Sequence, residues 1–142
     1  MAKFISILSK EKILKDKILA QTKLFQTKLN LQKEENENHF SMWEDLEYGG
    51  SGIEICFAKN SNDFNDKGIL ETHPEYSTIF LIKYFSEDQL IVPFLKLFTQ
   101  TYPNILIFND ESSSNFKRIF EKSDLDIIKG NDYWSLLGQK LM

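Results

Sequence analysis

The residue types that carry most enzyme chemistry are scarce in this chain of 142 residues. It contains one cysteine, Cys56, and two histidines, His39 and His73. Nucleophilic catalysis needs a serine or cysteine within reach of a base, and both histidines fall in segments of polar, loop-like composition. The chain also has no Gly-x-Ser-x-Gly motif, which would hold a nucleophilic serine on a sharp turn. The sequence therefore predicts no catalytic residue and a protein that is not an enzyme.

The single cysteine also limits what else the chain can hold. Cys56 stands between Ile55 and Phe57, which indicates a small core residue on a strand. A reactive thiol needs a base or a positive charge nearby, and the local sequence offers neither. One cysteine excludes both an intramolecular disulfide and a multi-cysteine zinc site.

Two loop motifs resemble ligand-binding loops only in part. Gly49-Gly-Ser-Gly52 precedes a strand, whereas phosphate-binding loops lead into a helix N-terminus. Asp63-x-Asn65-x-Lys67-Gly68 begins like a calcium loop, but Lys67 is a cation at a ligand position and Pro74 replaces the final glutamate. We expect no metal, no cofactor and no small-molecule ligand.

Hydrophobic periodicity predicts the elements that would position any site. Apolar residues recur at helical spacing over residues 11–33, and alternation indicates a strand over 53–57. Residues 78–85 and 105–108 are rich in β-branched and aromatic residues, which favours two further strands. A helix is expected after Ser86, where Pro93 either kinks it or begins its regular part. Shorter helices are expected around residues 116–120 and 131–137.

These elements predict one α+β domain spanning residues 1–142. The predicted fold class is a three- to five-stranded sheet with helices mainly on one face, with the ferredoxin-like arrangement as the specific candidate. A basic N-terminal helix at about 11–33 would precede an acidic body at about 41–142. No apolar run has the length of a membrane helix and the first residues do not read as a signal peptide, so we expect a cytoplasmic protein without a membrane partner.

Charge is distributed unevenly along the chain. Residues 1–33 hold eight lysines and two acids, a net charge of +6, although the whole chain carries −4. The remainder therefore carries −10. Aromatic residues lie within one of its acidic runs: the candidate partner-binding residues are Trp43, Glu44, Asp45, Glu47 and Tyr48. Large rings beside carboxylates are typical of an interface that anchors with the rings and attracts a basic partner.

In size, in the stretch Ser41-Met-Trp-Glu-Asp-Leu-Glu-Tyr48 and in the segment Tyr102-Pro-Asn-Ile-Leu-Ile-Phe-Asn-Asp-Glu111, the chain resembles the small acidic immunity proteins of bacterial toxin–immunity systems. The resemblance rests on general make-up and includes no diagnostic motif. It implies a protein that binds one cognate toxin, basic in charge, and blocks its active site.

Two other functions remain open on the sequence. The lysine-rich helix could bind nucleic acid or protein as part of a regulatory or accessory domain, although the acidic remainder would repel a polyanion. A small enzyme using carboxylates is the third hypothesis, but the nineteen acids of the body single out no pair.

Overall fold

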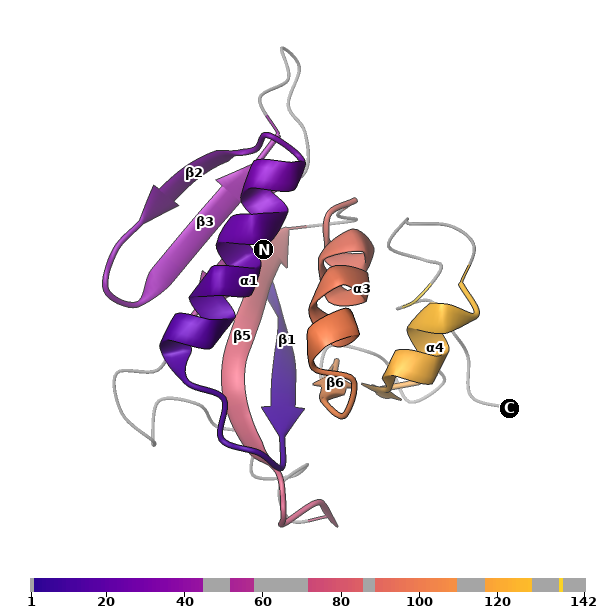
Figure 1. The fold of residues 1–142 in the computed structure, drawn as a ribbon. Helices are drawn as coiled ribbons and strands as arrows, with labels where there is room; N and C mark the ends of the chain where they lie inside the picture. The colour runs from indigo at the N-terminus through magenta and orange to yellow at the C-terminus, as the bar shows by residue number, and fades with distance from the viewer. Residues whose placement is uncertain are drawn as a thin grey trace.

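A computed structural model describes residues 2–44, 52–57, 72–85, 89–109, 117–128 and 136 of the chain. Within these residues, seven strands form one sheet in the order β2-β3-β4-β5-β1-β6-β7, and each neighbouring pair is antiparallel. The strands are β1 Ala2–Ser9, β2 Gln32–Glu35, β3 His39–Trp43, β4 Gly52–Cys56, β5 Ser77–Phe85, β6 Leu106–Phe108 and β7 Ile119–Phe120. The described helices are α1 Lys15–Lys28, α3 Ile91–Thr101 and α4 Lys122–Asp126 (Figure 1).

The predicted fold class is wrong, because the sheet has seven strands and not three to five. A ferredoxin-like domain has four strands, so that arrangement is excluded as well. Two of the strands that were missed, β2 and β7, lack a strand signal in their own sequence. Every residue of the edge strand β2 is exposed and polar, and β7 is two residues long.

The N-terminal helix is shorter than the predicted range 11–33. Asn30 adopts φ 53°, the left-handed conformation that ends helices, and the N–H of Leu31 donates to the carbonyl of Gln26 at 2.9 Å. The chain then forms the β2–β3 hairpin, in which the side-chain oxygen of Asn36 accepts from the N–H groups of Asn38 and His39. Polar residues that looked like the end of a helix therefore form a hairpin turn.

The three described helices place their buried side chains on one side of the sheet, which we call the covered face. Figure 1 shows α1 crossing in front of β5, with α3 beside it. The centre of this layer is aromatic: the ring of Phe94 in α3 lies 5.4 Å from Phe25 in α1 and 6.4 Å from Phe80 in β5. All three side chains are buried.

Strands β5 and β6 flank β1, and helix α3 connects them along the chain. Pro93 is the third residue of α3, so its missing N–H falls in the first turn, where no intrahelical partner exists in any case.

The prediction of a helix around 116–120 is wrong, since Ile119 and Phe120 form β7 and α4 begins at Lys122. The final helix expected at 131–137 lies outside the described residues apart from Leu136, which is buried.

Candidate functional site

The side of the sheet opposite the helices is the candidate functional site, and we call it the open face. Strand residues alternate between faces, so the pairing register assigns each side chain to one side. Ile53 and Ile55 of β4 point to the covered face, and Glu54 and Cys56 therefore point to the open face. The open face includes Phe4, Ser6 and Leu8 of β1, Gln32 and Glu34 of β2, His39, Ser41 and Trp43 of β3, Glu54 and Cys56 of β4, and Leu81 and Lys83 of β5.

Trp43 is the predicted interface residue that the structure places most clearly. It ends β3 on the open face, with 37% of its surface exposed. It pairs with Gly52, where an added Cβ would lie 3.0 Å from the Cβ of Trp43 and 3.2 Å from the carbonyl oxygen of Met42. The last glycine of the Gly-Gly-Ser-Gly run thus leaves room for the tryptophan, because a side chain there would crowd backbone atoms that cannot move away.

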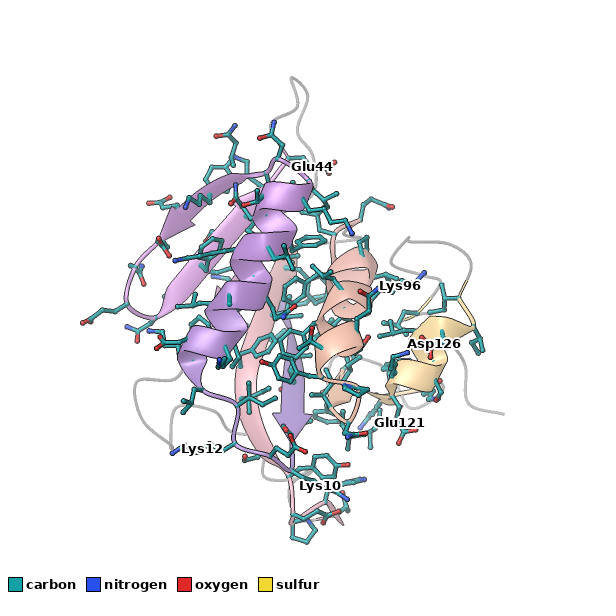
Figure 2. All side chains as sticks on the ribbon, viewed as in Figure 1. Lys10, Lys12, Glu44, Lys96, Glu121 and Asp126 are labelled. Atoms are coloured by element: carbon teal, nitrogen blue, oxygen red, sulfur yellow. The ribbon has the colours of Figure 1, made fainter. Side chains whose placement is uncertain are left out.

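Of the other predicted interface residues, only Glu44 is described. It follows β3 directly and is half-buried. Figure 2 shows it at the end of the molecule opposite Lys10 and Lys12, so this acidic residue and the first lysines are well separated. Asp45, Glu47 and Tyr48 lie outside the described residues, and their place in the interface stays a prediction.

A cluster of polar side chains that the sequence did not predict lies beside Ser41 on the open face. Nδ1 of His39 is 3.0 Å from Oε1 of Glu54, and Nζ of Lys83 is 3.8 Å from Oε2 of the same carboxylate. Cys56 is directly opposite His39 in the register. The donor atoms of His39, Glu54 and Cys56 all lie within 4.8 Å of one another. Three residue types that can ligate a metal therefore converge from two strands.

The surroundings of the Cys56 thiol determine its protonation state. Burial, and to a lesser extent the nearby Glu54 carboxylate, raise the pKa of Cys56 to about 12, while Lys83 acts in the opposite direction. Its Sγ–H donates to the main-chain carbonyl of Glu54 at 3.8 Å. Without another partner Cys56 is therefore a protonated, unreactive thiol at neutral pH.

The sequence missed this cluster because β3 was not predicted. His39 was assigned to a loop, whereas it is the first residue of β3, and the positive neighbour of Cys56 comes from β5. One local signal was available: Phe40 and Met42 alternate with polar residues, and both are buried. That alternation would have placed His39, Ser41 and Trp43 on one face.

The lysines of the alternative nucleic-acid hypothesis are partly occupied by contacts within the chain. The ammonium group of Lys10 lies 5.3 Å from the ring of Tyr76, that of Lys15 lies 5.2 Å from Phe57, and that of Lys33 lies 6.0 Å from Phe40. Lys15 also donates to the main-chain carbonyl of Glu37. These contacts within the chain engage three ammonium groups, which leaves fewer lysines for a phosphate-binding surface.

An open cleft of about 480 Å³ lies at the edge of the molecule where Figure 2 labels Lys10 and Glu121. Its lining joins the end of β1, the residues after α3 and the start of α4. Charges of both signs line it, including Lys10, Glu11, Glu121 and Lys122. The lining therefore favours no single charge of ligand.

No protein-family model, no curated protein and no solved structure matches this chain. Within the described residues, no helix combines the length and the apolar character that crossing a bilayer requires. What the chain does is therefore inferred from its own residues.

Proposed function

We propose that this protein is a non-enzymatic immunity protein that binds a cognate bacterial toxin of basic charge in the cytoplasm and blocks its active site. The observation that carries the proposal is the exposed ring of Trp43 on the open face. A partly exposed tryptophan at the end of a rigid strand offers a large anchoring area at little cost in conformational entropy. Such residues dominate many protein interfaces.

The charges around this ring suit a basic partner. Glu34 and Glu54 share the open face with Trp43, and Glu44 follows it in the chain. Lys83 is the one described cation assigned to this face, and it lies near Glu54. An excess of carboxylates speeds the encounter with a basic protein and fixes its orientation, while the ring supplies most of the affinity. Asp45, Glu47 and Tyr48, which follow Glu44 closely in the sequence, are proposed to extend this surface.

The partner is to be identified first. The tagged protein is recovered from its native bacterium in moderate salt, and a single polypeptide of equal amount that is lethal when expressed alone is the expected result. Retention of nucleic acid in place of that polypeptide, released steeply by rising salt, would contradict the proposal and favour the lysine-rich helix.

The purified pair then tests the surface. Trp43→Ala should raise the dissociation constant by about 30-fold or more, the effect of losing an interface hot spot of about 2 kcal/mol. Glu44→Lys with Glu47→Lys should slow association most at low salt. Leu24→Ala is the matched control, because Leu24 is 52% exposed but belongs to α1. Unchanged binding in Trp43→Ala, with the control also unchanged, removes the open face as the toxin-binding surface.

A further inference from the structure

We propose that His39, Glu54 and Cys56 form a binding site for a divalent metal ion of the zinc class on the open face. This inference does not rest on the proposed function, since the site would tie β3 to β4 whether or not a toxin binds nearby. The three residues supply one imidazole nitrogen, one carboxylate oxygen and one sulfur. Nitrogen, oxygen and thiolate donors in one set are what Zn²⁺ accepts in proteins.

The backbone already holds the three side chains in place. His39 and Cys56 are directly paired across β3 and β4, and Glu54 is two residues before Cys56 on the same strand and face. Zinc bonds of about 2.0–2.3 Å in a tetrahedron put neighbouring donor atoms about 3.3–3.8 Å apart. The donor atoms here lie within 4.8 Å of one another. Side-chain rotations that move the donor atoms by about 1 Å therefore suffice to bring them to the distances of a zinc site.

The imidazole nitrogen supplies a second, independent observation. Nδ1 of His39 is buried and has no hydrogen-bond partner among the described residues. It lies 3.0 Å from Oε1 of Glu54, but the contact lacks the angles of a hydrogen bond. A buried polar atom without a partner costs free energy, so such atoms are rare unless they have a role. Coordination of a metal ion by its lone pair would satisfy this nitrogen.

Lys83 orients the carboxylate for this role. Its Nζ lies 3.8 Å from Oε2 of Glu54, on the oxygen that does not contact His39. Oε1 is therefore the oxygen free to bind the metal, while the ammonium group holds the other oxygen in the manner of an outer-shell partner. The positive charge of Lys83 lowers the affinity for a dication, so the site is expected to be weaker than one with two carboxylates.

Metal binding requires one proton to leave. As the Sγ–metal bond forms, the Sγ–H proton of Cys56 passes to solvent, and the lone pairs of Nδ1 and Oε1 complete three bonds to the ion. No electron is transferred. Three protein ligands leave a fourth position open in a tetrahedral ion. Water or a side chain of a bound protein can occupy that position.

Cobalt(II) is the probe for the test, since it replaces Zn²⁺ and is coloured. The full chain is stripped with a chelator and titrated with Co²⁺. We expect one ion per chain, tetrahedral visible absorption, a thiolate-to-cobalt band in the near ultraviolet, and loss of both on adding Zn²⁺. Absence of the thiolate band at saturating Co²⁺ would overturn the proposal, and so would several weakly bound ions per chain.

Substitutions identify the ligands. His39→Ala and Glu54→Gln should each weaken Co²⁺ binding by at least about tenfold, the lower bound for disturbing even the outer shell of a metal site. Cys56→Ser should abolish the thiolate band. His73→Ala is the matched control and should bind as the original chain does, because His73 lies outside the cluster. Unchanged affinity in both His39→Ala and Glu54→Gln would overturn the assignment even if Cys56→Ser failed to fold.

Discussion

The two faces of the sheet are stabilised by different interactions. On the covered face, apolar side chains from the strands and from α1, α3 and α4 pack into one continuous core. Phe94 and Phe98 stack with ring centres 6.1 Å apart, and Phe80 meets Phe98 edge-on at 5.3 Å. Such packing contributes stability in proportion to buried area, and any loss of volume leaves a cavity.

Among the described residues, the open face holds only a small apolar cluster, around Leu8 and Leu106, beside a partly exposed ring and a polar cluster. Trp43 is 37% exposed, and the carboxylate of Glu54 contacts both His39 and Lys83. Partly exposed ion pairs contribute little to stability because water screens them. The comparison indicates that the covered face holds the fold together, while the open face presents groups that can act on a partner or an ion.

The largest effect on stability is expected from a substitution on the covered face. Phe94→Ala should lower the free energy of unfolding by about 3–5 kcal/mol, because it removes a buried ring from the centre of the aromatic core. Urea unfolding followed by circular dichroism measures the loss. Phe4→Ala is the control: Phe4 is 38% exposed on the open face and should lose less than half as much. Equal losses of unfolding free energy would show that both faces contribute equally to the stability of the fold.

A smaller effect is expected where the open face is tightly packed. Gly52→Ala should destabilise the protein by about 1–3 kcal/mol, the usual range for an added methyl group without room. The atoms it would meet are the Cβ of Trp43 and the carbonyl oxygen of Met42. The loss should persist in a Trp43→Ala background, which keeps the Cβ, and shrink in a Trp43→Gly background. A neutral Gly52→Ala would mean that β3 and β4 are not held at this separation.

The covered face was the more predictable of the two from sequence. The regions of β4 and β5 were predicted, because apolar residues at period two and runs of β-branched residues are local signals. The strand count was wrong because β2 consists of polar residues that strand pairing, and not burial, holds in place. Local propensity gives no warning of such an edge strand.

Which side chains meet on the open face depends on the register of strand pairing, and no local sequence pattern reveals that register. His39 and Cys56 become neighbours only because β3 pairs with β4, and Lys83 joins them only because β5 is next in the sheet. A one-residue shift in either pairing would send these side chains to different faces. Trp43 was chosen from composition alone, which reported its chemistry but neither its strand nor its neighbours.

The smallest predicted effect concerns the buried thiol of the open face. Burial and Glu54 raise the pKa of Cys56 to about 12 in the folded chain. Between the ordinary thiol pKa and that value, the unfolded chain loses a proton that the folded chain keeps. The stability that Cys56 contributes is therefore complete at pH 8 and declines as the pH rises above the unfolded pKa.

Between pH 8 and pH 10 the original chain should thus lose about 1 kcal/mol more unfolding free energy than Cys56→Ala. Urea unfolding in the presence of a chelator measures both proteins without metal. The lysines titrate alike in the two chains, so their effect cancels in the difference. Equal losses would mean that Cys56 ionises as easily in the folded chain as in the unfolded one. The open face would then be wetter at this point than the 7% exposure of Cys56 indicates, and the contrast between the two faces would be sharper.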